Sequence, residues 1–194
     1  MLGSDPIKRS RSAIRLTYDD FVHFPDDGMR HELIDGEHYE TPSPNTKHQT
    51  VAMNLTTMFV LWLETHPIGR LCHAPFDVVF SDFDVVEPDL FYMSNQRWAE
   101  IVTPQHVRGA PELVIEIGSK RTRKRDETIK KQLYERAGVA EYWFVDPEID
   151  VVRVYRRDGT RFTRPTERSR DAGDILTTPL LPRLDLPLAR IFRE

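Results

Sequence analysis

The sequence contains the run Leu113-Val114-Ile115-Glu116-Ile117, in which one carboxylate lies among aliphatic residues that favour β-strands. A buried carboxylate is costly unless a cation or hydrogen bonds satisfy it. Two interpretations of Glu116 are therefore open. Either the strand lies at the edge of a sheet and Glu116 faces water, or Glu116 is buried for a functional reason.

A second strand pattern runs from Val85 to Met93 around Pro88-Asp89. Proline has no N–H to donate to a sheet and aspartate is a poor strand former, so the pair marks an irregularity in the strand. If this strand lies beside the Glu116 strand, Asp89 and Glu116 can share a divalent cation. Their hard oxygen ligands suit Mg²⁺ or Mn²⁺.

A helix predicted over residues 123–137 adds a cation to this pair. Leu133, Tyr134 and Ala137 define its inward face, and Lys130 projects near the centre of that face with Asp126 one turn earlier. A lysine on an apolar face needs a carboxylate partner. The helix follows the Glu116 strand closely, so it should pack back across that strand.

We therefore expect Asp89, Glu116 and Lys130 to converge. Two carboxylates, a metal ion and a lysine form a phosphodiesterase constellation, in which the metal activates water and the lysine positions it. A buried bridge between Lys130 and a carboxylate, without chemistry, is the alternative, and the sequence does not choose between the two.

A basic run lies between Glu116 and Lys130 in the sequence. It consists of Lys120-Arg121-Thr122-Arg123-Lys124-Arg125. Such a run is commonly a solvated loop. Here it would flank the expected metal site, where a phosphate backbone needs cations, so the DNA-binding candidates are Arg121, Arg123, Lys124 and Arg125.

Length and composition bound the remaining classes. The 194 residues suit one domain over residues 16–194 after a flexible tail over residues 1–15. Lysine and arginine number 27 against 31 acidic residues, and the net charge of −4 argues against a generally basic nucleic-acid coat. One cysteine excludes a disulfide framework and a multi-cysteine zinc site. No secretory signal or membrane span is found, so the cytoplasm is expected.

The order of predicted elements indicates an α/β or α+β domain with a mixed sheet. An Asp35-Gly36 turn predicts an N-terminal hairpin over residues 30–41. The other expected elements are a short helix near 18–23, a helix over 47–65, strands over 70–74, 76–80, 112–117, 141–145 and 151–157, and an irregular segment over 175–192.

Histidine, aspartate and cysteine residues elsewhere in the sequence are further candidates for chemistry. His48 opens the long helix and acts either near a scissile phosphate or as a local cap, the latter being slightly favoured. Asp77 is either a supporting acid or a hairpin-edge residue. Cys72 is expected to be an inert core thiol. No zinc spacing is found among the other histidines, at positions 31, 38, 66, 73 and 106.

The chain resembles the "putative restriction endonuclease" (Uma-type) family of the PD-(D/E)XK nuclease superfamily. The likeness extends from about residue 16 to residue 192 and rests on a series of segments in order. These are His31-Glu32-Leu33-Ile34-Asp35-Gly36-Glu37, Pro42-Ser43-Pro44 with Lys47-His48-Gln49, Glu87-Pro88-Asp89-Leu90, residues 108–117, Asp126 with Lys130, residues 134–139 and residues 141–147.

The resemblance implies a restriction-endonuclease-like core, a mixed sheet flanked by helices. It matches Asp89 to the PD aspartate, Glu116 to the following acid and Glu32 to a further metal ligand or base. The usual lysine would fall at Gly118, and Lys130 takes its place on the next helix. Lys120 is a competing catalytic cation. The implied cofactor is Mg²⁺ or Mn²⁺, and the implied partner is DNA.

The sequence is compatible with two main functions. The first is a Mg²⁺-dependent DNA endonuclease, for which a homodimer would suit cleavage of both strands. The second is a catalytically inactive module that uses the same fold to bind nucleic acid or a protein. A carboxylate-pair glycosidase is disfavoured because it has no use for an inward lysine.

Overall fold

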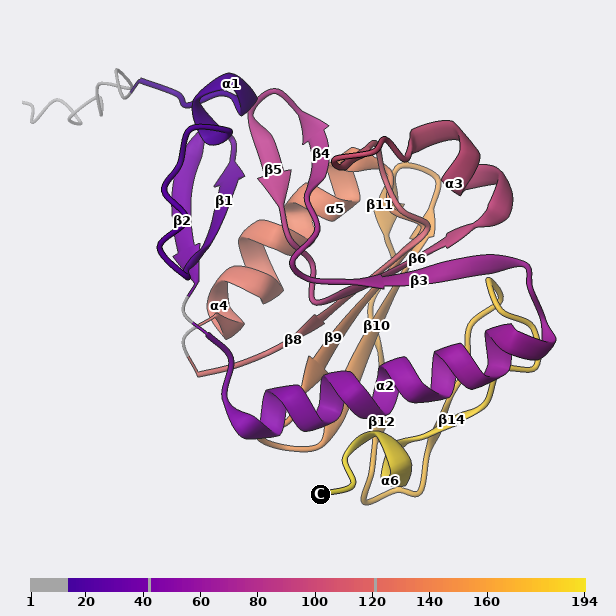
Figure 1. Cartoon of the computed structure of the whole chain (residues 1–194). Coiled ribbons are helices and arrows are strands. Elements are labelled where there is room, and N and C mark those ends of the chain that lie inside the picture. Colours follow the sequence, from indigo (N-terminus) through magenta and orange to yellow (C-terminus); the bar gives the residue numbers. More distant parts are fainter. Residues whose placement is uncertain (1–13, 42, 121) are drawn as a thin grey trace, which may run out of the picture.

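The structure is a computed structural model that describes residues 14–41, 43–120 and 122–194 (Figure 1). The tail expected over residues 1–15 lies outside the described residues as far as residue 13. Arg15 is described, and its guanidinium pairs with the Asp35 carboxylate in the hairpin turn. None of the described helices has the length and apolar character needed to cross a bilayer.

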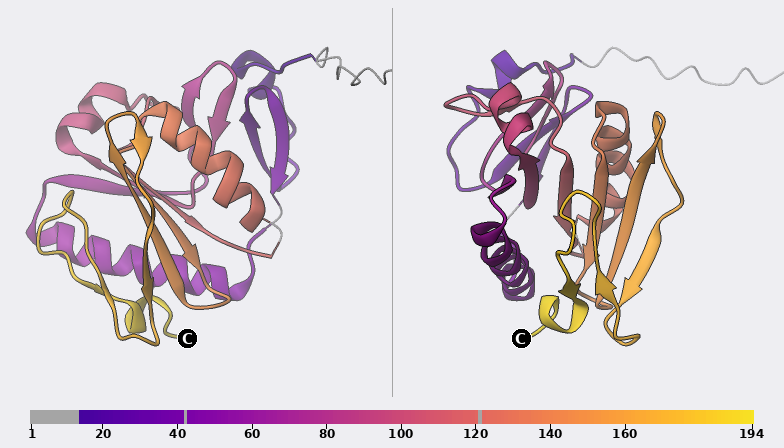
Figure 2. Two further views of the ribbon diagram at one scale, coloured as in Figure 1. Left: turned by 180° about the vertical axis from the view of Figure 1, so that it is seen from behind. Right: turned by 90° about the vertical axis from the view of Figure 1, so that its right-hand side faces the viewer.

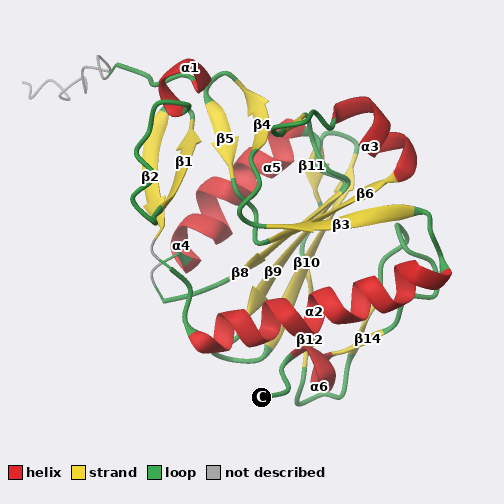
Figure 3. Ribbon diagram, viewed as in Figure 1, coloured by secondary structure: helices red, strands yellow, loops and turns green. Residues whose placement is uncertain are grey.

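Helices lie between runs of strands along the chain, as the sequence predicted (Figure 3). The helical elements are α1 (Tyr18–Phe21), α2 (Thr46–Thr65), α3 (Asn95–Ile101), α4 (Arg123–Arg125), the π-helical turn η1 (Asp126–Lys130), α5 (Lys131–Ala137) and α6 (Leu188–Ile191). The strands are β1 (Arg30–Ile34), β2 (Glu37–Thr41), β3 (Gly69–His73), β4 (Val78–Ser81), β5 (Asp84–Val86), β6 (Leu90–Ser94), β7 (Val107–Arg108), β8 (Leu113–Ile117), β9 (Glu141–Asp146), β10 (Val151–Asp158), β11 (Arg161–Phe162), β12 (Thr166–Ser169), β13 (Ile175–Leu176) and β14 (Leu186–Pro187).

The strands form two larger mixed sheets and one small ribbon. The larger sheet has the order β11-β10-β9-β8-β6-β3, with β12 also paired to β10. Its central pair, β8 and β9, is parallel, and β6 runs antiparallel to β8. The other sheet has the order β2-β1-β5-β4-β7, and β13 pairs with β14. This mixed α+β architecture confirms the predicted fold class.

Helices cover both faces of the larger sheet. Helix α2 lies along one face and the α4-η1-α5 segment along the other (Figure 2). The side chains of β8 point alternately to the two faces of the sheet and contribute to a hydrophobic core on each face. Leu113, Ile115 and Ile117 pack toward the α2 side, whereas Val114 packs among α5 residues. Glu116 therefore points to the α5 side of the sheet.

The N-terminal hairpin is confirmed. Strands β1 and β2 pair in register from Arg30 opposite Thr41 to Ile34 opposite Glu37. The turn residues Asp35 and Gly36 have φ of 55° and 75°, the left-handed values that a two-residue hairpin turn requires.

Three expectations about elements were wrong in detail. The strand predicted from Val85 to Met93 is two strands, β5 and β6, in different sheets, because Pro88 interrupts the hydrogen-bonding ladder. The helix predicted over residues 123–137 contains the π-helical turn η1. The C-terminal segment is less irregular than expected, since its apolar residues form β13, β14 and α6 against α2.

Strand β8 lies inside the larger sheet, so the edge-strand interpretation of Glu116 is wrong. Glu116 is 3% exposed. The strand pair β6–β8 also places Asp89, directly before β6, next to the end of β8, because antiparallel neighbours begin and end at the same edge.

Candidate active site

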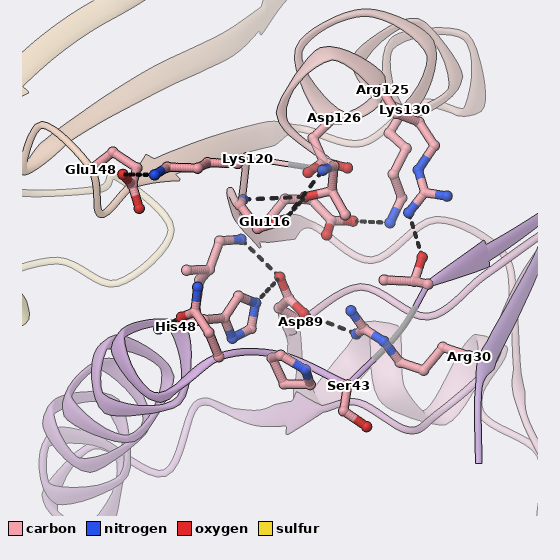
Figure 4. A pocket seen from close by; sticks show the side chains of 16 residues that line it. Arg30, Ser43, His48, Asp89, Glu116, Lys120, Arg125, Asp126, Lys130 and Glu148 are labelled. Atoms are coloured by element: carbon pink, nitrogen blue, oxygen red, sulfur yellow. Dashed lines mark hydrogen bonds and ion pairs between the residues drawn. The ribbon is translucent and has the colours of Figure 1, made fainter.

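The candidate site lies where several elements begin or end at one edge of the larger sheet. Strand β6 begins there, β8 ends there, and helices α2 and α4 begin beside them (Figures 1 and 4). A cavity of about 360 Å³ opens at this place. Its lining includes Asp89, Glu116, Asp126 and Lys130 together with His48 from α2.

Asp89 is buried and held by three donors. Its Oδ1 accepts from Arg30 Nη1 at 2.9 Å, and its Oδ2 accepts from the Ile117 backbone N–H at 2.8 Å and lies 3.0 Å from His48 Nε2. Burial by itself would raise the pKa of Asp89. The hydrogen bond and charge of His48, with the charge of Arg30 and the Ile117 amide, instead hold this pKa well below its usual range. Asp89 is therefore ionised and fixed in orientation.

Burial and a neighbouring cation act in opposite directions on the pKa of Glu116. Its Oε1 lies 2.7 Å from Lys130 Nζ and also accepts from the Tyr134 hydroxyl. Burial raises the pKa of Glu116 to about 8, against the opposing charge of Lys130, and the carboxylates of Asp89, Asp126 and Glu32 add to the increase. The Lys130 ammonium and the Tyr134 hydroxyl are thus the groups that satisfy this buried acid within the described part of the chain.

Lys130 lies between two carboxylates. Its Nζ donates to Glu32 Oε1 at 2.7 Å and pairs with Glu116 Oε1 at the same distance, and the residue is 2% exposed. Burial would lower the pKa of Lys130, but the charges of Glu116, Glu32 and Asp126 raise it above its ordinary value. The lysine is therefore a fixed, buried cation.

Glu32 reaches the site from strand β1 of the other sheet. Its Oε1 accepts from Lys130 and from the Glu87 backbone N–H, and its Oε2 lies 3.4 Å from Arg125 Nη2. Burial would raise the pKa of Glu32, but the charges of Lys130 and Arg125 lower it. The buried Oε2 has no hydrogen-bond partner, so one carboxylate oxygen has unused acceptor capacity.

Gly118 cannot carry the lysine that the superfamily pattern would place there. A Cβ at this position would lie 2.5 Å from Cζ and 2.8 Å from Cε2 of Phe144, whose ring is fully buried. Any side chain at residue 118 would collide with the core. The cation instead comes from η1, twelve residues further along the chain.

The other candidate residues differ in how they lie relative to the cavity. His48 does not act as a local cap, because its ring pairs with Asp89 and its backbone N–H is itself capped by Asn45 Oδ1. Lys120 lies at the rim of the cavity, where its exposed side chain is 3.7 Å from Glu148. Asp77 is half-buried and does not line the cavity. Cys72 is a partly buried free thiol whose pKa burial raises to about 11.

The basic run is dispersed. Arg123 turns away to pair with Asp146 and Glu127, and Lys124 is exposed to solvent. Arg125 lines the cavity and approaches Glu32. Arg121 lies outside the described residues. Of the run's described cations, Lys120 and Arg125 are those that line the cavity.

Three contributors were missed or underrated in the sequence. Arg30 lies two residues before Glu32, and strand alternation puts both on one face of β1, a signal that the sequence does contain. Tyr134 reads as an apolar helix residue, yet its hydroxyl binds Glu116. Asp126 lines the cavity as a fourth carboxylate, and burial raises its pKa to about 6.

The donor set fits a hard divalent cation. Among the described residues that line the cavity, no three His, Cys, Asp or Glu side chains have ligand atoms that all lie within 4.8 Å of one another. Two carboxylates with water completing the shell is the manner in which proteins usually hold Mg²⁺. The unused acceptor capacity of Glu32 Oε2 is a further observation in favour of this fit.

The fold and the charged cavity together define a protein of the restriction-endonuclease-like class. A family model described as "Putative restriction endonuclease" (Uma2) matches residues 18–189, and the chain belongs to this family. The resemblance inferred from the sequence is thereby confirmed.

One solved structure supports the fold independently. It is the crystal structure of a putative nuclease belonging to DUF820 from Anabaena variabilis, with a TM-score of 0.77 and 20% sequence identity. The likeness covers 91% of this chain and 97% of that chain. No match is found among curated proteins.

Proposed function

We propose that this protein is a metal-dependent endonuclease that hydrolyses phosphodiester bonds of DNA. The observation that carries the proposal is Lys130, a buried cation held between Glu32 and Glu116 at the wall of an open cavity. Buried ion pairs are weak contributors to stability, because desolvation offsets their attraction. Three acidic side chains, Glu32, Glu116 and Asp126, act on this one lysine beside open space, an arrangement that is more readily understood as a site for chemistry.

Asp89 and Glu116 would hold the cation, Mg²⁺ or Mn²⁺. Such an ion, when bound, polarises a phosphoryl oxygen and makes a bound water more acidic. The chain's own residues do the positioning: His48 and Arg30 orient the Asp89 carboxylate, and Tyr134 orients Glu116. Lys130 would orient the attacking water and neutralise developing charge, and Glu32 would hold Lys130 in place.

Cations at the cavity suit a phosphate backbone. Arg30, Lys120 and Arg125 all contribute to its lining. The overall negative charge of the chain does not oppose this, because the acidic groups that line the cavity are the ones that a metal ion would neutralise. Cleavage of both strands favours a homodimer, and the cytoplasm remains the compartment expected from the sequence.

The decisive experiment is cleavage of supercoiled plasmid DNA in Mg²⁺, in Mn²⁺ and in EDTA. We expect cleavage with either ion and none in EDTA. Asp89→Asn and Lys130→Met should each reduce the rate at least ~100-fold, the order expected for lost electrostatic stabilisation. Lys131→Met is the matched control, since the neighbouring Lys131 faces Tyr155 and not the cavity.

Circular dichroism of each variant separates loss of chemistry from loss of folding. Nicking by Asp89→Asn and by folded Lys130→Met at the parental rate would contradict the assignment.

An inactive binding module is the second candidate, and one observation favours it. The charges of the site already compensate one another, because Asp89 is paired with Arg30 and His48 and Lys130 with Glu32 and Glu116. A module of this kind would bind nucleic acid or a protein in EDTA as well as in Mg²⁺ and would cleave DNA in neither.

A further inference from the structure

A second cluster of metal-ligating side chains lies on the opposite face of the N-terminal hairpin. His31, His38 and Glu40 each offer a ligand atom, and these three atoms lie within 4.8 Å of one another. The sequence shows no zinc spacing here. The hairpin register creates the group by placing His31 opposite Glu40 and Leu33 opposite His38, so that all four share one face.

We propose that His31, His38 and Glu40 form a binding site for a transition-metal cation of the Zn²⁺ class. The site is separate from the carboxylate cavity, because His31 and Glu32 are consecutive in β1 and point to opposite faces of the strand. Two imidazoles and one carboxylate are the donors that suit Zn²⁺, Co²⁺ or Ni²⁺ rather than Mg²⁺.

The hydrogen bonds around His31 prepare it as a ligand. His31 Nε2 lies 3.1 Å from Asp27 Oδ1, and the backbone N–H of Met29 holds the same oxygen at 2.9 Å. A carboxylate accepts hydrogen bonds and does not donate them, so the His31 Nε2 carries the proton that it donates to Asp27. His31 Nδ1 is then left with its lone pair. This carboxylate–histidine arrangement is the one that commonly supports protein-bound zinc.

The second histidine is already within a ligand's distance of the first. His38 Nε2 lies 3.0 Å from His31 Nδ1. Two nitrogens bound to one tetrahedral zinc at ordinary bond lengths are about 3.3 Å apart. A small separation of the two rings, with transfer of the His38 ring proton to its other nitrogen or to solvent, would direct both lone pairs at one ion.

Burial and packing fix one side of the site and leave the other open. His31 is 8% exposed, whereas His38 and Glu40 are exposed. The Phe24 ring contacts both imidazoles, with ring centroids 5.5 Å from His31 and 4.5 Å from His38. Three protein ligands and an open side leave the fourth position for water. A bound ion would link β1 to β2 on the face of the hairpin opposite to Glu32.

The test is Zn²⁺ binding by the full chain without a polyhistidine tag, after treatment with a chelator, in buffer containing millimolar Mg²⁺. The magnesium occupies hard-oxygen sites and leaves the imidazole site to zinc. We expect one Zn²⁺ per chain by calorimetry, a higher melting temperature, and the visible absorption of tetrahedral cobalt when Co²⁺ replaces zinc.

Variants at exposed ligands avoid damage to the core. His38→Gln and Glu40→Gln should each weaken binding at least ~10-fold. Asp27→Asn keeps an oxygen for Met29 but removes the charge, and should weaken binding about 10-fold, the lower end of the effect of such supporting carboxylates. His73→Gln, an exposed histidine of β3, and His48→Gln in the other cavity are the controls.

Unchanged affinity in both His38→Gln and Glu40→Gln would overturn the proposal, as would the absence of Zn²⁺ binding by the parent. Loss of binding in His48→Gln but not in His38→Gln would place the ion in the carboxylate cavity instead. None of these outcomes depends on nuclease activity.

Discussion

Lys130 shows how one buried charge can organise a site. It compensates Glu32 and Glu116 at 2.7 Å each, and these acids come from two different sheets. Removing one member of a buried charge network leaves its partners uncompensated, which is costlier than never having had the network. The stability of this region should therefore depend more on Lys130 than on either of its carboxylate partners alone.

We predict that Lys130→Met lowers the free energy of unfolding by about 3–5 kcal/mol, the usual cost of breaking a buried pair. Adding Glu32→Gln should recover part of the loss, since it removes one uncompensated charge. Urea unfolding of the two variants and of Glu32→Gln alone measures the coupling. Strictly additive effects would show that Lys130 and Glu32 do not stabilise one another.

The cost of Lys130→Met should also shrink in acid. Lys130 lowers the pKa of Glu32, so the stabilisation from this pair is present above the ordinary glutamate pKa and is lost as pH falls through the lowered value. Unfolding of parent and variant at pH 8 and at pH 4 checks the sign.

At the scale of elements, the end of β8 is shaped by the absence of a side chain. Gly118 follows β8 directly, and its backbone N–H donates to the Val145 carbonyl while the Phe144 ring fills the space beside it. The turn into the basic run is consequently tight, and Asp89 can accept from the neighbouring Ile117 amide.

We predict that Gly118→Ala destabilises the protein by about 1–3 kcal/mol through overpacking against Phe144. Thermal or urea unfolding measures this loss. A smaller side chain in place of the Phe144 ring should relieve this overpacking. The loss of stability caused by Gly118→Ala should therefore be smaller in a Phe144→Leu background. An equal cost in both backgrounds would mean that the collision with Phe144 is not the cause.

At the scale of the whole molecule, one sheet joins two cores. Alternate residues of β8 and β9 feed the α2 side and the α5 side, and the second core also includes Ile34, Val78 and Val107 from the smaller sheet. Because both sheets share this packing, the described chain should behave as the single domain predicted over residues 16–194.

We predict one cooperative unfolding transition. Tryptophan fluorescence, which includes the buried Trp143, and far-ultraviolet circular dichroism should give the same urea midpoint. Separate transitions, with one assigned to the hairpin sheet, would contradict a single unit.

The local features of this protein follow from its sequence alone. Hydrophobic periodicity predicted helix α2 and strands β8, β9 and β10, and the Asp35-Gly36 turn predicted the hairpin. These inferences succeed because turn chemistry and side-chain periodicity act over a few residues. The unusual placement of Asp89, Glu116 and Lys130 among apolar residues also indicated them as site candidates, and their chemical roles stay predictions.

Which distant residues meet is set by the three-dimensional packing of the chain. The pairing of Glu32 with Lys130, of His48 with Asp89, and of His31 with His38 depends on strand register and on how elements cross. This packing also separated β5 from β6, dispersed the basic run and excluded a lysine at Gly118. The physical reason is that these contacts are set by packing between segments far apart in sequence, which no local pattern encodes.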